Sequence, residues 1–104
     1  MIVELHPEAE QELLEAALWY DEQREGLGGE FLDDLSRWVD VAVEYPSRWP
    51  KWPDAPPIEP RMQRIVTDGF PFSIGFQVFG ERFRILAFAH ASRRPFYWAE
   101  RAGS

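Results

Sequence analysis

The sequence contains no cysteine and only two histidines, His6 and His90. Without thiols the chain can form neither disulfides nor thiolate metal sites, so its stability depends on the packing of its side chains. Two histidines are also too few for a histidine-rich metal site. We therefore expect no bound metal ion and no cofactor.

The sequence also lacks long apolar segments. No stretch reaches the roughly 18 apolar residues that a membrane-spanning helix requires. Residues 1–7 read MIVELHP, without the basic start and the apolar core of a secretion signal. We expect a cytoplasmic protein with no membrane partner, and the length of 104 residues predicts one domain over residues 1–104.

Lysine is scarce, since Lys51 is the only one, and the formal net charge is −7. Residues 1–60 carry 15 acidic and 4 basic side chains, whereas residues 61–104 carry 3 acidic and 7 basic ones. The second part either is an ordinary sheet behind an acidic surface or faces an anionic partner. We interpret one acidic series as a solvated helix face: Glu8, Glu10, Glu12 and Glu15.

The first half of the sequence predicts a helical hairpin. Pro7 suits the first turn of a helix, so the first helix should cover residues 7–24 and the second residues 30–44. Gly28 and Gly29 are expected to loosen the turn between them. Apolar residues recur at helical spacing in both segments: Ala9, Leu13, Ala16, Ala17 and Tyr20 in the first, and Phe31, Leu35, Trp38, Ala42 and Tyr45 in the second.

A proline-rich loop separates this hairpin from the strands. Residues 46–60 contain six prolines, and we expect Trp49 and Trp52 in this loop to pack rather than to bind nucleic acid. Beyond the loop the period of the apolar residues changes from 3.6 to 2. Strands are predicted over residues 2–6, 61–67, 72–78 and 82–90, with Gly80-Glu81 as the turn between the last two.

The order of these elements predicts an α+β fold of the form β-α-α-β-β-β. It consists of a small antiparallel-type sheet with the helical hairpin packed on one face. In the last strand, alternation places Phe83, Ile85, Ala87 and Ala89 on one face and Arg84, Leu86, Phe88 and His90 on the other. We expect the face opposite the helices, which carries some of the arginines, to be freer.

Short motifs occur in a fixed order along the chain: His6 to Glu10, Glu15 to Ala17, Trp19-Tyr20, Gly26 to Gly28, Phe31-Leu32, Phe70 to Phe72, Leu86 to His90, Arg93 to Pro95, Tyr97-Trp98 and Arg101. In this order they resemble the RelE/ParE family of toxins from type II toxin–antitoxin systems, often called plasmid stabilisation proteins. The resemblance covers nearly the whole chain and agrees with the predicted fold.

The resemblance implies a bacterial toxin that is neutralised by a cognate antitoxin in a hetero-oligomer. ParE-like members poison DNA gyrase, whereas RelE-like members cut messenger RNA on the ribosome. An acidic chain with one lysine is poorly suited to docking on ribosomal RNA. The helical hairpin is also long, which resembles ParE-like members more than RelE-like ones. We therefore favour a ParE-like gyrase inhibitor. The alternatives are a RelE-like endoribonuclease, in which case the chain is an enzyme, and a non-toxic relative that acts as a protein-interaction module.

The resemblance places candidate catalytic residues of the RelE-like alternative near the C-terminus: His90, Arg93 and Tyr97. Histidine can transfer a proton near neutral pH, and arginine can stabilise the charge on phosphate. Each candidate also has a structural interpretation, namely a local hydrogen bond, an ion pair or the packing of the tail. The candidates for binding a target or the antitoxin are Arg61, Arg64, Arg84, Arg93, Arg94, Tyr97 and Trp98.

Overall fold

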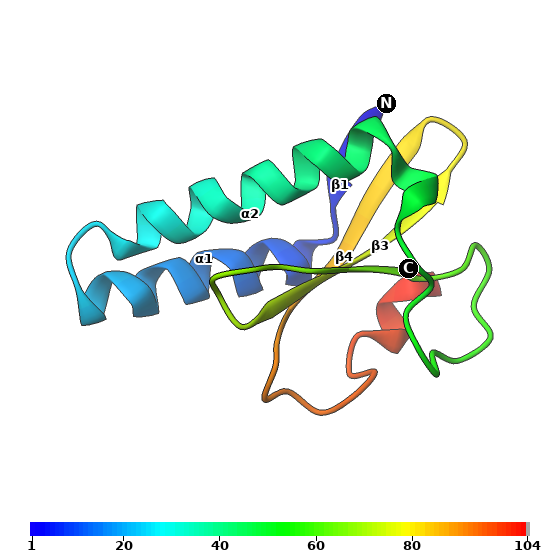
Figure 1. Cartoon of the computed structure of the whole chain (residues 1–104). Helices are drawn as coiled ribbons and strands as arrows, with labels where there is room; N and C mark the ends of the chain where they lie inside the picture. The colour runs from blue at the N-terminus through cyan, green and yellow to red at the C-terminus, as the bar shows by residue number, and fades with distance from the viewer. Residues whose placement is uncertain (104) are drawn as a thin grey trace.

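The computed structural model of the protein describes residues 1–103 and contains a four-stranded sheet with two helices on one face (Figure 1). The strands are β1 (Ile2–Leu5), β2 (Gln63–Val66), β3 (Phe72–Phe79) and β4 (Arg82–His90), in the spatial order β1-β4-β3-β2. The predicted α+β fold and element order are confirmed. The sheet is mixed, because β1 pairs parallel with β4 while the other pairs are antiparallel. No hairpin turn joins β1 to β4, so nothing local imposes antiparallel pairing there.

The helical hairpin consists of α1 (Pro7–Gln23) and α2 (Leu27–Glu44). The second helix begins three residues earlier than predicted, so Gly28 and Gly29 belong to its first turn and do not loosen the connection. Gly28 is buried where the helices meet, and its N–H donates to Oδ1 of Asp21 at 2.7 Å. A Cβ atom on Gly28 would lie 2.3 Å from the carbonyl oxygen of Ala17. The glycine is therefore required by the close approach of the two helices.

The main core lies between the helices and the sheet. The predicted stripes of both helices contribute to it, except for Tyr45, which is exposed. Close to the turn of the hairpin, Phe31 packs against Tyr20 of α1 and Phe72 of β3, with ring centroids 5.0 Å apart in both pairs. Aromatic pairs at this separation add stability beyond the apolar area that they bury.

A bulge at Leu86 interrupts the alternation that we predicted for β4. Gly75 pairs with Ala87 and Phe76 pairs with Ile85, so Leu86 has no partner on β3. A bulge adds one residue and reverses the faces beyond it. As a result Phe88 joins the core on the helix side, whereas Leu86 and Ala87 lie in a second core on the opposite face. The predicted faces were therefore wrong for the four residues beyond the bulge: Ala87, Phe88, Ala89 and His90.

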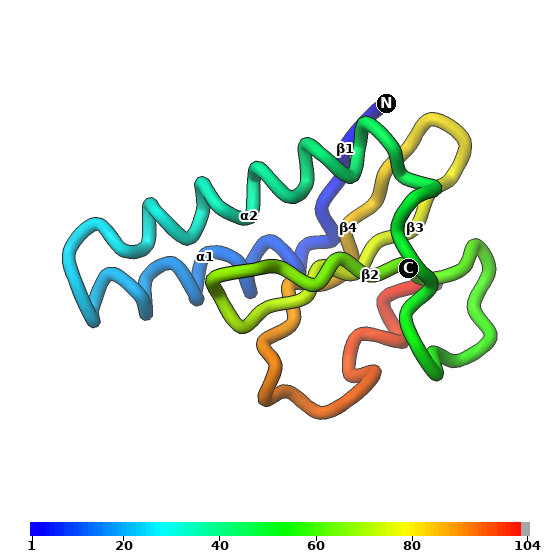
Figure 2. Tube along the Cα trace, viewed as in Figure 1, coloured from blue at the N-terminus to red at the C-terminus, as the bar shows by residue number. Residues whose placement is uncertain are grey.

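The face opposite the helices is covered, which contradicts our expectation that it is freer. The chain from the proline-rich loop and the C-terminal tail pass side by side under this face (Figure 2). Trp52 from the loop and Trp98 from the tail meet with ring centroids 4.9 Å apart. Gly75 leaves room for this contact, since a Cβ atom there would lie 3.0 Å from the Trp52 ring.

The loop is held in place by specific hydrogen bonds. The side chain of Gln63, which is buried, donates to the carbonyl oxygens of Pro46 at 2.8 Å and Trp49 at 2.9 Å. A short 3-10 helix, η1 (Pro46–Arg48), begins the loop. Trp49 packs on the helix-side core and Trp52 on the second core, as predicted for a loop whose tryptophans pack.

Another 3-10 helix, η2 (Ala99–Gly103), ends the described chain. No helix in residues 1–103 is long and apolar enough to cross a membrane.

The contact at Gly28 generates a paired prediction. Gly28→Ala should lower the free energy of unfolding by about 1–3 kcal/mol, because the added methyl group forces the helices apart. Gly29→Ala should instead raise it by up to about 1 kcal/mol, since no atom lies within 4 Å of a Cβ there and alanine favours the helix. Urea denaturation followed by circular dichroism measures both. Equal effects at the two positions would contradict the close approach.

His6 generates a prediction about pH. Its Nδ1 accepts the backbone N–H of Glu8 at 3.1 Å and so caps α1. Burial, followed by the charge of nearby Arg84, lowers the pKa of His6. The unfolded chain, with an ordinary pKa of about 6.5, therefore takes up this proton more readily than the folded one.

The stability contributed by His6 should be complete above pH 6.5 and should decline as the pH falls below that value. His6→Asn keeps a capping acceptor that does not titrate, so it should flatten this part of the curve. His6→Ala should cost about 1 kcal/mol across the range. The midpoint of urea unfolding between pH 5 and pH 8 tests these expectations, and an unchanged slope in His6→Asn would refute the role of His6.

Candidate functional site

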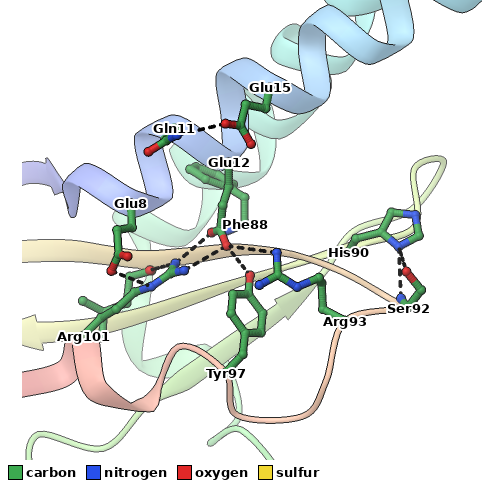
Figure 3. A network of polar contacts seen from close by, with 11 residues as sticks. Glu8, Gln11, Glu12, Glu15, Phe88, His90, Ser92, Arg93, Tyr97 and Arg101 are labelled. Carbon is green, nitrogen blue, oxygen red and sulfur yellow. Dashed lines mark hydrogen bonds and ion pairs between the residues drawn. The ribbon is translucent and has the colours of Figure 1, made fainter.

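Glu12 of α1 lies at the centre of a polar network between the helix and the C-terminal tail (Figure 3). One carboxylate oxygen accepts the Tyr97 hydroxyl at 2.6 Å, and Arg101 donates to both oxygens at 2.9 and 3.1 Å. The backbone N–H of Phe88 in β4 also donates to Glu12, at 3.1 Å. A single carboxylate thus joins three segments that are remote in the sequence.

The position of Glu12 follows from the helical repeat. Ala9 and Ala16 lie three residues before it and four after it, so all three side chains share one face of α1. Ala9 is buried in the main core and Ala16 packs against it, so Glu12 lies on the side of α1 that faces the rest of the protein. Only 13% of the Glu12 side chain is exposed, so our interpretation of Glu12 as part of a solvated face was wrong.

Arg101 provides the charge that compensates Glu12. Its side chain is 10% exposed, and it donates to the carbonyl oxygen of Leu86, the bulged residue of β4, at 3.0 Å. A second carboxylate, that of Glu8, lies 3.3 Å away. Burial by itself would lower the pKa of Arg101, but the hydrogen bond to Glu12 and the negative charges of Glu12 and Glu8 together outweigh it, so the pKa of Arg101 is raised. The tail is therefore fixed by a charge-assisted contact that little solvent reaches.

The hydroxyl group of Tyr97 belongs to the same network. Burial and the hydrogen bond to the Glu12 carboxylate both raise the pKa of its phenol. The guanidinium of Arg93 lies 3.9 Å from the centre of the Tyr97 ring and 3.9 Å from Glu12. A phenol that donates to a carboxylate at neutral pH holds its proton, so it is poorly placed to act as a general base.

His90 lies at the exposed end of β4, next to this network. Its Nδ1 accepts the backbone N–H of Ser92 at 3.0 Å and lies 2.8 Å from the hydroxyl oxygen of the same residue. The ring also makes an edge-to-face contact with Phe72, with centroids 5.2 Å apart. The local hydrogen bond that we considered for His90 is therefore present, and the ring remains exposed.

The arginines of the tail line a cavity of about 310 Å³ together with β2 and β4. Arg93 and Arg94 contribute to its wall from the tail, and Arg64 contributes from β2. The Arg64 guanidinium lies over the Trp52 ring, 5.5 Å from its centre, and its Nε is buried without a hydrogen bond. We call this space the cationic cavity. It brings together three of the arginines that the sequence indicated, with His90 at its edge.

Two other predicted residues, both arginines, lie elsewhere, whereas Trp98 forms part of the inner wall of the cationic cavity. Trp98 has no exposed surface, because it fills the second core. Arg61 is exposed in the segment before β2 and does not line the cationic cavity. Arg84 is half-buried on β4, opposite Glu4 of β1 in the strand register, and does not line the cationic cavity.

Residue types alone did not indicate the ion pair between Glu12 and Arg101. The spacing of Glu12 with Ala9 and Ala16 was a signal, because an acidic residue on the small-residue face of a helix can lie under another segment. Arg101 entered only through the family resemblance. No local pattern pairs residues 89 positions apart, so the contact depends on the tertiary fold.

The network generates a prediction about stability. Glu12→Gln should lower the free energy of unfolding by about 3 kcal/mol, because it leaves Arg101 buried without its main counter-charge. Glu15→Gln is the matched control. Glu15 is exposed and is bonded by the Gln11 side chain, so its effect should stay within about 0.5 kcal/mol. Urea denaturation measures both variants, and equal losses would show that Glu12 does not hold the tail.

Comparisons with known proteins support the fold. No family model matches the sequence, and neither does any curated protein. One solved structure, described as "Chromosomal ParDE TA system from P. aeruginosa", contains a similar chain with a TM-score of 0.75 and 17% sequence identity. The match covers 88% of this chain and 97% of that one. At this identity the likeness establishes the fold: the chain has the architecture of a protein from a ParDE toxin–antitoxin system.

Proposed function

We propose that this chain is the toxin of a type II toxin–antitoxin pair. It acts in the cytoplasm, inhibits growth by poisoning DNA gyrase as ParE-like toxins do, and is neutralised by a cognate antitoxin. The observation that carries the proposal is the fold shared over 88% of the chain with a protein from a ParDE system. The sequence motifs that resemble the RelE/ParE family support the same proposal.

The geometry around Glu12 supports a ParE-like toxin over a nuclease. Cleavage of RNA without a metal requires a group that removes the 2′-hydroxyl proton and a cation that stabilises the phosphorane. The Tyr97 hydroxyl donates a hydrogen bond to Glu12, and the guanidinium of Arg93 lies over the Tyr97 ring. Both residues are therefore engaged in holding the tail, which disfavours their use in catalysis.

The cationic cavity favours a second candidate, a RelE-like ribosome-dependent endoribonuclease. Arg64, Arg93 and Arg94 line one space with His90, which is a suitable set for binding phosphate and transferring a proton. Under this alternative His90 replaces Tyr97 as the general base. A third candidate is a non-toxic relative that keeps the fold as a protein-interaction module, and harmless expression distinguishes it from the other two.

Pulse-labelling after induced expression without antitoxin tests the proposal. Thymidine incorporation into DNA should fall within minutes, before methionine incorporation into protein. His90→Ala is the matched variant, because His90 is exposed and its loss should leave the fold intact. A gyrase poison should remain toxic in this variant, and purified protein should stabilise gyrase–DNA cleavage complexes.

The opposite order of labelling would refute the gyrase proposal. If protein synthesis fails first, if messenger RNA is cut on ribosomes, and if His90→Ala removes both effects, the chain is a nuclease. If cells expressing the protein at a verified level grow normally, the chain is not a toxin and the interaction module is supported.

A further inference from the structure

A second, apolar cavity lies on the other side of the tail from the cationic cavity, between α1 and the end of β4. Its volume is about 330 Å³, and Ala16, Trp19, Tyr20 and Phe72 form most of its wall. His90 and Arg93 line this cavity as well as the cationic one. The two cavities therefore flank the segment that runs from the end of β4 into the tail.

We propose that these two cavities together bind an acidic segment of a partner protein, which inserts an apolar side chain beside Trp19 and places carboxylates against Arg64 and Arg94. The inference rests on the proposed function in one respect, namely that this partner is the antitoxin. It adds the chemistry of the segment and a set of contact residues, Ala16, Trp19 and Tyr20, that were not among the binding residues predicted from the sequence.

The exposure of Trp19 supports an apolar anchor. The tryptophan is 55% exposed although its ring lies at the wall of an apolar cavity, where a partner can cover it. Tryptophan at the edge of a pocket is a frequent centre of binding energy in protein interfaces. The floor of the cavity is rigid, because Tyr20 and Phe72 belong to the aromatic cluster of the core.

Uncompensated charge supports an acidic segment. Within residues 1–103 no carboxylate forms an ion pair with Arg64 or Arg94. Glu12, the acidic residue of α1 nearest to the tail arginines, is already engaged by Tyr97 and Arg101. A basic segment would therefore leave the guanidiniums of the cationic cavity unpaired, whereas carboxylates can satisfy them bidentately.

The arrangement of the two cavities suits an extended segment. Successive side chains of an extended chain point to opposite sides and are spaced about 3.3 Å apart along the chain. A segment that crosses the tail near Arg93 can thus direct one side chain into the apolar cavity and its neighbours into the cationic one. A second copy of this chain is a poor occupant, because most of its acidic residues lie on the helices α1 and α2 and not on an extended segment.

Selection from a phage-displayed library of random 12-residue peptides on the full chain tests the proposal. The recovered peptides should share an aromatic residue or leucine next to aspartate or glutamate. Their affinity should fall about tenfold or more for Trp19→Ala and for Arg94→Glu, and the loss for Arg94→Glu should shrink as salt is added. Leu18→Ala is the matched control, since Leu18 is 65% exposed on α1 and lines neither cavity, and its affinity should stay within twofold.

Three outcomes would overturn the proposal: no consensus, a basic consensus, or binding that is unchanged in Trp19→Ala. A fourth is tight binding of a 12-nucleotide single-stranded RNA that Arg94→Glu abolishes, with no peptide consensus, which would assign the cationic cavity to nucleic acid. The selection does not depend on toxicity. An acidic and apolar consensus on a harmless chain would refute the toxin proposal alone, whereas a toxic chain without the consensus would refute only the segment proposed here.

Discussion

The largely buried carboxylate of Glu12 connects three parts of the molecule: α1, the end of β4 and the C-terminal tail. It joins α1 to Arg101 and Tyr97 of the tail and to the backbone of β4 at Phe88. A buried carboxylate is costly unless cations and donors surround it, and here it has both. The same contacts determine where Arg93 lies, because its guanidinium stacks on Tyr97. The candidate site around the tail therefore depends on a residue that belongs to the helical hairpin.

The sheet separates two cores of different origin. On one side the apolar stripes of α1 and α2 pack on β3 and β4, and this core follows from simple amphipathic patterns. On the other side the loop and the tail supply Trp52 and Trp98, which cover a face that an isolated sheet would expose. The bulge at Leu86 contributes to the packing of both cores. It turns Phe88 toward the helices while Leu86 faces the tail, and the carbonyl group of Leu86 accepts Arg101.

This arrangement leaves a cavity on each side of the tail. The structural role of Tyr97 and the engagement of Arg93 weigh against catalysis by these two residues, whereas Arg64 and Arg94 keep charges that no carboxylate within residues 1–103 compensates. A protein that leaves the charges of Arg64 and Arg94 uncompensated is suited to binding an acidic partner. That property is compatible with a toxin held inactive by an antitoxin, and it does not depend on the identity of the toxin's target.

The sequence by itself determined the element order, the helical stripes and the hairpin at Gly80-Glu81, because these depend on local periodicity and turn chemistry. It also indicated the arginines that line the cationic cavity. Only the tertiary structure decided the parallel pairing of β1, the covered second face and the burial of Glu12 and Trp98. These features arise from contacts between residues far apart in the chain, and a bulge of one residue was enough to exchange the predicted faces of Ala87 and Phe88.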